Sequence, residues 1–186
     1  MPDETTDQSK PRVVALIPAY NEVAQIESIV RGASGYVDAV VVIDDGSDDG
    51  TAAAAALAGA AVIAHPTNRG KGAALRSGFT WAVRHGADLA FTLDADGQHD
   101  PEEMPAFLEM YERTGADLII GQRTYEEMPR VRRWANRTGR RLLSLAMGQD
   151  VPDNQCGYRL YSRRLMMLLQ EMEAEEDRDR FSYEVE

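Results

Sequence analysis

Residues 91–101 read Phe-Thr-Leu-Asp-Ala-Asp-Gly-Gln-His-Asp-Pro, an apolar strand that runs into two carboxylates and then into a turn. In open α/β sheets, ligands bind at the carboxyl ends of the strands. Carboxylate oxygens are hard ligands that suit a divalent cation holding phosphates. The pair Asp94 and Asp96 therefore predicts a cation and phosphate site at the end of a buried strand.

The sequence around this stretch alternates strands with helices. Such alternation implies βαβ units and a largely parallel sheet, so the predicted fold class is α/β. We expect Pro18 to end the first strand and Asn21 to cap the first helix. The predicted strands cover residues 12–17, 39–43, 61–64, 89–93, 118–120 and 158–161, and the predicted helices cover 22–31, 51–58, 70–85, 101–113, 132–147 and 163–172.

Length and composition indicate one soluble domain. The chain has 186 residues, enough to bury a core, and we expect a domain over 11–186 after a disordered polar tail at 1–10. The lone cysteine, Cys156, excludes an internal disulfide and fits a reducing compartment. The N-terminus lacks the basic and apolar parts of a signal peptide, and no apolar run reaches the ~20 residues that span a bilayer. These features predict a cytoplasmic protein.

The charge is strongly negative but unevenly spread. The formal net charge is −11, which argues against nucleic acid as a partner. The acidic residues either form an ordinary solvated surface or keep the protein soluble in a very salty cytoplasm. Residues 128–149 nevertheless contain six arginines and no acidic residue. An acidic protein that keeps one basic segment is expected to use that segment for an anion.

Three more loops with polar or glycine-rich sequence follow or precede the predicted elements on the same sheet edge. They are Pro18-Ala-Tyr-Asn-Glu22, Asp44-Asp45-Gly-Ser47 and Asn68-Arg-Gly-Lys71-Gly72. Taken alone, the first loop is better explained by a capped turn, whereas the spare carboxylate of the second modestly favours a functional role. The third is explained about equally well by a glycine-rich start of a helix, and it lacks the P-loop pattern. Lys71 is one of only two lysines, and a cation beside helix amides can bind phosphate.

With the carboxylate stretch, these loops make the chain resemble the family 2 glycosyltransferases, from about Val13 to Glu186. The resemblance implies a GT-A fold, a Rossmann-like sandwich with a central, mostly parallel sheet flanked by helices. Residues 94–99 are similar to the polyprenyl-phosphate sugar synthases, including the dolichyl-phosphate mannose synthases. Residues 153–161 and 121–123 are similar to the dolichyl-phosphate glucosyltransferases.

The resemblance also implies a donor site. Pro18, Tyr20 and Glu22 would line the nucleotide, and Ile43 and Asp45 would surround its base and ribose. Lys71 would lie near the phosphates, and Asp94 and Ala95 would contact the donor. Asp96 would bind Mg²⁺ or Mn²⁺, together with Asp94 and Gln98.

The acceptor side rests on the basic segment and on one acid. Arg123 and one of Arg132 and Arg133 would hold phosphates, and Asp153 would orient the acceptor or balance charge. A phosphate acceptor is already ionised, whereas a hydroxyl acceptor would make Asp153 the candidate base. The implied catalytic residues are thus Asp96, Asp153 and Arg123.

The basic segment at 130–147, which contains the predicted helix at 132–147, has two interpretations. Its apolar side can pack on the sheet while the arginines face solvent, as in most amphipathic helices. Alternatively, the helix lies peripherally at the cytoplasmic membrane face, attracted to anionic headgroups. The sequence leaves both open.

The function implied is metal-dependent, inverting transfer of mannose or glucose, from GDP-mannose or UDP-glucose, to a polyprenyl phosphate of the dolichyl type. Transfer to a soluble or glycan hydroxyl, a nucleotidyltransferase, and a non-catalytic nucleotide-sugar-binding domain remain as alternatives. Relatives usually continue beyond the segment that ends at Glu186, so the chain can also be read as truncated.

Overall fold

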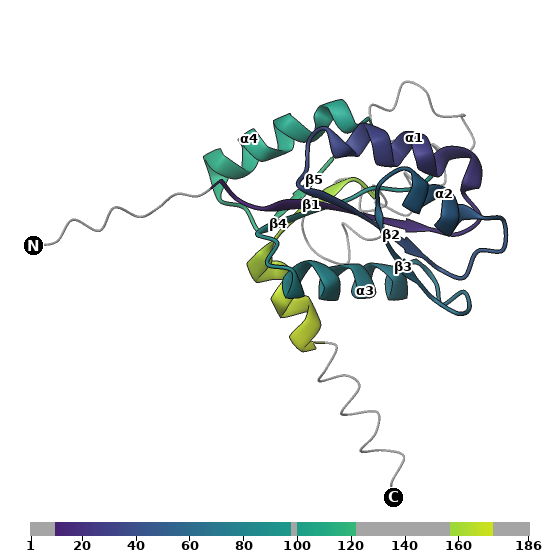
Figure 1. The fold of residues 1–186 in the computed structure, drawn as a ribbon. Helices are drawn as coiled ribbons and strands as arrows, with labels where there is room; N and C mark the ends of the chain where they lie inside the picture. The colour runs from purple at the N-terminus through teal and green to yellow at the C-terminus, as the bar shows by residue number, and fades with distance from the viewer. Residues whose placement is uncertain (1–9, 98–99, 122–156, 173–186) are drawn as a thin grey trace, which may run out of the picture.

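The computed structural model describes residues 10–97, 100–121 and 157–172 (Figure 1). Within these ranges the chain forms six strands in one sheet, with helices on both faces. The strands are β1 (Val13–Ala19), β2 (Ala39–Asp44), β3 (Ala61–Ala64), β4 (Leu89–Thr92), β5 (Leu118–Ile120) and β6 (Arg159–Ser162). The helices are α1 (Val23–Ser34), α2 (Thr51–Leu57), α3 (Lys71–Arg84), the 3₁₀ turn η1 (Pro101–Glu103), α4 (Met104–Thr114) and a last helix over 163–172.

The order of strands in the sheet is β3-β2-β1-β4-β6-β5. The four strands from β3 to β4 run parallel, while β6 is antiparallel to both of its neighbours. The prediction of a mostly parallel α/β sheet is therefore confirmed. The chain builds outward from β1 to β3 and then crosses to β4 on the other side of β1. This reversal makes the carboxyl edge between β1 and β4 a topological switch point, where such sheets bind ligands.

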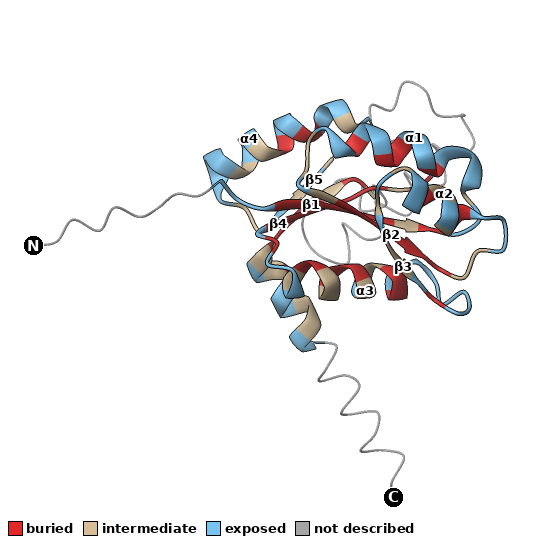
Figure 2. Cartoon of the chain, in the orientation of Figure 1, coloured by how far each residue is buried: buried red, intermediate tan, exposed pale blue. Residues whose placement is uncertain are grey.

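The core lies on both faces of the sheet. Alternate residues of β1 point to opposite sides, and both sets are buried. On one face they pack with α1, α2 and α4, and on the other with α3 and the last helix, as Figure 1 shows. In Figure 2 the buried surface of each labelled helix faces the sheet. Burial of both faces explains why β1 and β2 are continuous apolar runs in the sequence.

The first strand is longer than predicted, because it continues through Pro18 to Ala19. Pro18 is paired with Ile43 of β2, whereas the pairing of β1 with β4 stops at Leu16. Proline has no amide hydrogen and is tolerated where a strand lacks a neighbour on one side. The proline therefore lies just beyond the point where the pairing of β1 with β4 ends, and it does not end β1 itself.

The prediction that Asn21 caps α1 through its side chain is wrong. The N-cap is Glu22, and no side-chain hydrogen bond caps the helix from within its own loop. Asn21 instead adopts a positive φ of 57° and accepts a hydrogen bond from the Asp48 amide at 3.1 Å. The first amides of α1 are satisfied from the next loop, since Thr51 Oγ1 accepts from Glu22 at 2.9 Å and Asp49 Oδ2 from Val23 at 3.1 Å.

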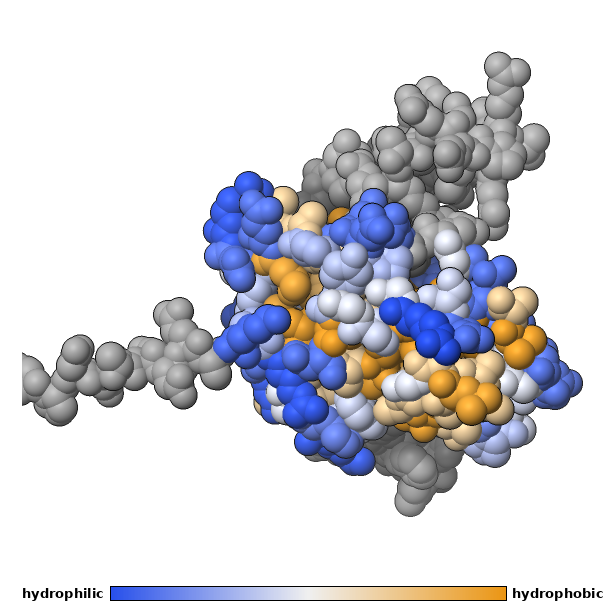
Figure 3. Space-filling view, turned by 45° about the horizontal axis from the view of Figure 1, so that its top comes forward, coloured by the Kyte–Doolittle hydropathy of each residue, from blue (hydrophilic) through white to orange (hydrophobic). Residues whose placement is uncertain are grey.

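The exposed surface carries scattered apolar side chains. Figure 3 shows hydrophobic colour in separate patches between hydrophilic areas on the face that it draws. Among the described residues, no helix has both the length and the apolar character needed to cross a membrane.

Helix α3 approaches the sheet closely at Gly78. A Cβ built there would lie 3.0 Å from Cδ1 of Ile43 and 3.3 Å from Cδ1 of Leu16, both of which are fully buried. At Gly72, earlier on the same helix, a Cβ would meet only Nη1 of Arg76, at 3.9 Å. The small residue at position 78 thus sets how near α3 lies to β1 and β2.

We expect Gly78→Val to destabilise the protein by roughly 1–3 kcal/mol, because the added methyl groups overpack the core beneath α3. The matched control, Gly72→Val, should be close to neutral, since its side chain enters solvent and valine suits a helix slightly better than glycine. Urea denaturation of both variants measures the difference. Equal losses at the two positions would contradict close packing at Gly78.

Candidate active site

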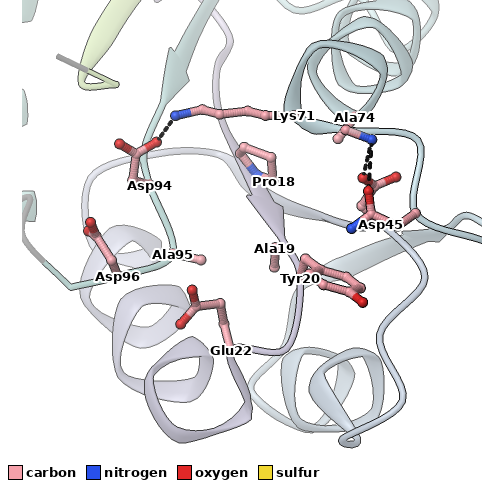
Figure 4. Close-up of a pocket in the computed structure, with 12 residues that line it drawn as sticks. Pro18, Ala19, Tyr20, Glu22, Asp45, Lys71, Ala74, Asp94, Ala95 and Asp96 are labelled. Atoms are coloured by element: carbon pink, nitrogen blue, oxygen red, sulfur yellow. Dashed lines mark hydrogen bonds and ion pairs between the residues drawn. The ribbon is translucent and has the colours of Figure 1, made fainter. Parts of the chain in front are cut away.

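A cavity of about 250 Å³ opens at the carboxyl edge of β1, β2 and β4. Its walls come from the ends of these strands and from the start of α3, as Figure 4 shows. Four sequence motifs that are far apart in the chain therefore meet at the switch point of the sheet. The lining residues are Pro18, Ala19, Tyr20, Glu22, Asp45, Asn68, Gly70, Lys71, Ala74, Asp94, Ala95 and Asp96.

Charged groups of both signs lie in this cavity. Lys71, the first residue of α3, reaches across to an ion pair with Asp94, which follows β4 (Figure 4). The Lys71 side chain is 54% exposed and the Asp94 side chain 19% exposed, so both remain accessible from the cavity. Tyr20, which is 49% exposed, lies with Asp45 on the side of the cavity away from Asp94. One side of the site therefore offers an aromatic surface beside Asp45, and the other offers the ion pair of Lys71 with Asp94.

Asp45 anchors the loop that begins α3. Its carboxylate accepts hydrogen bonds from the backbone amides of Arg69, at 3.0 and 3.1 Å, and of Gly70, at 2.7 Å. The side chain of Asp45 also bonds Nδ1 of His65 at 2.6 Å, and Nε2 of the same ring lies 2.9 Å from Oγ of Ser77 on α3. Although burial by itself raises the pKa of Asp45, the bonds from His65 and the two amides outweigh it and lower the pKa below its ordinary value.

The backbone of this loop also passes close to Gly46. The φ of Gly46 is +80°, and a Cβ there would overlap backbone atoms of Thr67 and Asn68. Only glycine fits this conformation and this approach. Asp45 and Gly46 thus fix the position of residues 67–70 against the end of β2, and with it the position from which Lys71 projects.

Other predicted residues are placed differently. Ile43 is fully buried in the core beneath α3 and is not among the residues that line the cavity. Gln98, Arg123, Arg132, Arg133, Asp153 and the predicted basic helix lie outside the described residues. From the sequence, His65 was missed as a partner of Asp45, and Ser77 as a partner of His65. The histidine follows β3, and nothing local in the sequence indicates its contact.

The fit of a divalent cation can be judged from the two carboxylates present. Asp94 and Asp96 both line the cavity on the loop that follows β4. Within the described ranges, no group of three histidine, cysteine or acidic side chains comes together as a preformed metal cage. Mg²⁺ and similar ions commonly bind through one or two carboxylates, with water and substrate phosphates completing the shell. The residues present fit a cation bound together with a diphosphate.

Comparison with known proteins identifies the family. The model of glycosyl transferase family 2 matches residues 14–168. The chain belongs to this family. It is 35% identical over 178 residues to polyprenol monophosphomannose synthase of Mycolicibacterium smegmatis, covering 88% of this chain and 66% of that protein. It is 36% identical over 162 residues to undecaprenyl-phosphate mannosyltransferase of Micrococcus luteus, covering 81% and 66%.

The fold of this family 2 member is also found in solved structures. Glucosyl-3-phosphoglycerate synthase from Mycobacterium tuberculosis, in complex with Mn²⁺, uridine diphosphate and glucosyl-3-phosphoglycerate, is 26% identical, with a TM-score of 0.68. The likeness covers 84% of this chain and 58% of that one, and it confirms the predicted GT-A architecture. The chain spans a little under two thirds of the length of the two mannosyl-transferring relatives.

The anchoring role of Asp45 predicts a pH dependence of stability. Because the folded state lowers its pKa below the ordinary 3.8, ionised Asp45 stabilises the fold above that pH. The contribution is lost as the pH falls below about 4 toward the lower pKa of the folded state. We expect Asp45→Asn to cost roughly 1–3 kcal/mol at pH 7 and progressively less in acid.

Denaturation curves recorded from about pH 3 to about pH 7 measure this difference. The control is Asp48→Asn, an exposed acid in the same loop. A constant difference between wild type and Asp45→Asn at every pH would contradict the assignment.

Proposed function

We propose that this chain is the donor-binding and catalytic part of a metal-dependent, inverting glycosyltransferase. It moves a hexose, mannose or glucose, from a nucleotide sugar to a polyprenyl phosphate. The observation that carries the proposal is the cavity at the switch point, where the aromatic Tyr20, the cation of Lys71 and the carboxylates Asp94 and Asp96 converge. The proposal is supported by the two relatives that act on polyprenyl phosphates by name.

The two sides of the cavity suit the nucleoside and the diphosphate of a nucleotide sugar. An exposed aromatic ring such as Tyr20 provides a flat surface for a nucleobase. Glu22 and Asn68 also line the cavity and would offer polar groups to the ribose and base. Lys71 and the first amides of α3 provide positive charge for the phosphates. The donor would then lie with its base near Tyr20 and its diphosphate near Asp94.

The chemistry is one displacement. An acceptor phosphate oxygen attacks the anomeric carbon from the face opposite to the diphosphate, so a bond forms there while the bond to the diphosphate oxygen breaks. The electron pair leaves with the nucleoside diphosphate, and the configuration at carbon inverts. Lys71 stabilises the negative charge that develops on the leaving group, and Asp94 orients the ammonium group.

A bound Mg²⁺ or Mn²⁺ would neutralise charge on the diphosphate, and Asp96 with Asp94 would hold it. Gln98 is a further candidate on the same loop. The Mn²⁺ in the crystal structure of the glucosyl-transferring neighbour supports such a use of metal. Lys71 balances the charge of Asp94 through their ion pair.

For the acceptor, Arg123 and one of Arg132 and Arg133 are proposed to hold its phosphate, and Asp153 to orient it. The basic segment at 130–147 would bring these groups to the cytoplasmic membrane face, where anionic headgroups attract arginines. A phosphate monoester carries its own negative oxygen, so this acceptor needs no general base.

The first test of this proposal is Asp96→Ala. We expect the variant to keep the fold of the wild type, because Asp96 is exposed, but to lose about 100- to 1000-fold in metal-dependent transfer. The variant should also fail to bind Mn²⁺ together with a nucleotide sugar. Mn²⁺ with a nucleotide sugar should raise the melting temperature of the wild type by mass action and leave that of Asp96→Ala unchanged.

The matched control for this test is Glu102→Ala. Glu102 is an exposed acid on η1, outside the lining of the cavity, so its removal should leave both transfer and the melting shift as in the wild type. Full transfer activity in Asp96→Ala would contradict the assigned role of this carboxylate.

A second test separates the two classes of acceptor. With a phosphate acceptor, Asp153→Asn should change kcat by less than about tenfold, because no proton has to be removed from the attacking oxygen. With a hydroxyl acceptor, the same variant should lose roughly 100- to 10,000-fold in kcat while still binding the acceptor. Steady-state kinetics with a polyprenyl phosphate and with a soluble glycan acceptor distinguish the two outcomes.

A further inference from the structure

The loop that carries Asp94 and Asp96 is held by the residues that begin β6. Gly157 lies directly against Asp94, so that a Cβ built on Gly157 would overlap both carboxylate oxygens and the carboxyl carbon. Tyr158, the next residue, donates a hydrogen bond from its hydroxyl to the carbonyl oxygen of Asp100 at 3.1 Å. Residues 157 and 158 therefore contact the carboxylate loop near its beginning and near its end.

These two residues are themselves fixed by the sheet. The carbonyl oxygen of Gly157 accepts a hydrogen bond from Oγ1 of Thr92, the last residue of β4, at 2.8 Å. The carbonyl oxygen of Tyr158 accepts from the amide of Gly121 at 2.9 Å. The antiparallel pairing of β4 with β6 starts at the next residue, where Thr92 faces Arg159. The backbone above Asp94 is thus tied to strands on both sides.

Tyr158 is also packed firmly. The residue is 2% exposed, and its ring lies 4.7 Å from that of Phe107 on α4 and 6.1 Å from that of Phe91 on β4, measured between centroids. Burial raises the pKa of the Tyr158 hydroxyl far above its ordinary value, so the group remains a neutral donor. An aromatic ring packed in this way holds its hydroxyl at one position above Asp100.

We propose that Gly157 and Tyr158 are positioning residues that form a brace over the carboxylate loop, with Gly157 directing the Asp94 carboxylate toward Lys71 and Tyr158 holding Asp100. The inference rests on the proposed function, since it gives the braced loop the task of holding a nucleoside diphosphate. The brace requires glycine at 157 because of the space that Asp94 occupies. A methyl group there would rotate the carboxylate out of its place and release the ammonium group of Lys71.

The two lysines of the chain make this measurable without any ligand. An amine that is ion-paired with a carboxylate is shielded from an acylating reagent, whereas Lys10 is exposed and serves as an internal reference. The labelling rate of Lys71 relative to Lys10, followed by peptide mass spectrometry, therefore reports whether Asp94 still faces Lys71. Asp94→Ala gives the rate for a fully released Lys71.

We expect Gly157→Ala to raise the relative labelling rate of Lys71 by about two- to fivefold, the range for loss of an exposed ion pair. In the double variant Gly157→Ala/Asp94→Ala, the rate should equal that of Asp94→Ala alone, because the methyl group then has nothing to displace. Gly35→Ala, where a Cβ would meet no atom closer than 4.0 Å, is the matched control and should match the wild type. An unchanged rate in Gly157→Ala, or additive effects in the double variant, would overturn the brace at Gly157.

The second readout is binding of Mn²⁺ with uridine diphosphate and with guanosine diphosphate, measured by calorimetry. Gly157→Ala and the milder variants Tyr158→Phe and Thr92→Val, each of which removes one hydroxyl, should weaken the binding at least about threefold, as expected for loss of one hydrogen bond. Tyr111→Phe, which removes a hydroxyl on α4, should bind as the wild type does.

The outcomes separate the brace from the function on which it rests. If the wild type binds neither diphosphate with Mn²⁺, the proposed function is wrong, while the labelling experiment still tests the contact between Gly157 and Asp94. If the wild type binds one of them and the three variants bind it equally well, the positioning role is overturned and the proposed function stands.

Discussion

The arrangement of the site depends on the buried carboxylate of Asp45 and its hydrogen bonds to the amides of Arg69 and Gly70. A carboxylate at the end of a central strand is costly to bury unless its oxygens find donors, and here the loop before α3 supplies them. The same bonds fix where α3 begins, so Lys71 projects over the end of β1 toward Asp94. A residue that follows β2 thereby determines the distance between a cation from α3 and the acids that follow β4.

The sequence predicted this arrangement well where the signal was local. Strands β3 and β5 have the predicted bounds, and the elements that the structure describes follow in the expected order, because apolar runs separated by glycine-rich turns leave few alternatives. The loops that line the cavity could be predicted for a related reason. Parallel strands end at one edge, so motifs that follow strands must meet there, whatever their distance in the chain. The loops that contain Pro18, Tyr20, Glu22, Lys71 and the acids of the carboxylate loop were placed at one edge in this way, and the family resemblance supplied the roles of the single residues.

The contacts that the sequence could not predict are those between loops. Nothing near Asn21 indicates that its helix is capped by Asp49 and Thr51, and nothing near His65 indicates its bond to Asp45. The resemblance to the family implied that Ile43 lies near the base and ribose, yet strand alternation turns its side chain into the core. The close approach of Gly157 to Asp94 depends on the antiparallel return of β6, which the sequence pattern does not distinguish from a parallel strand.

The central claim is that the cavity transfers a hexose to a lipid phosphate. The most direct measurement incubates the protein and Mn²⁺ with labelled GDP-mannose or UDP-glucose and a polyprenyl phosphate in detergent, then separates the lipid product and identifies the released nucleotide. The account predicts a labelled glycosyl phospholipid and one nucleoside diphosphate per transfer. Release of pyrophosphate, or label that appears only on a hydroxyl acceptor and never on the lipid, would contradict it.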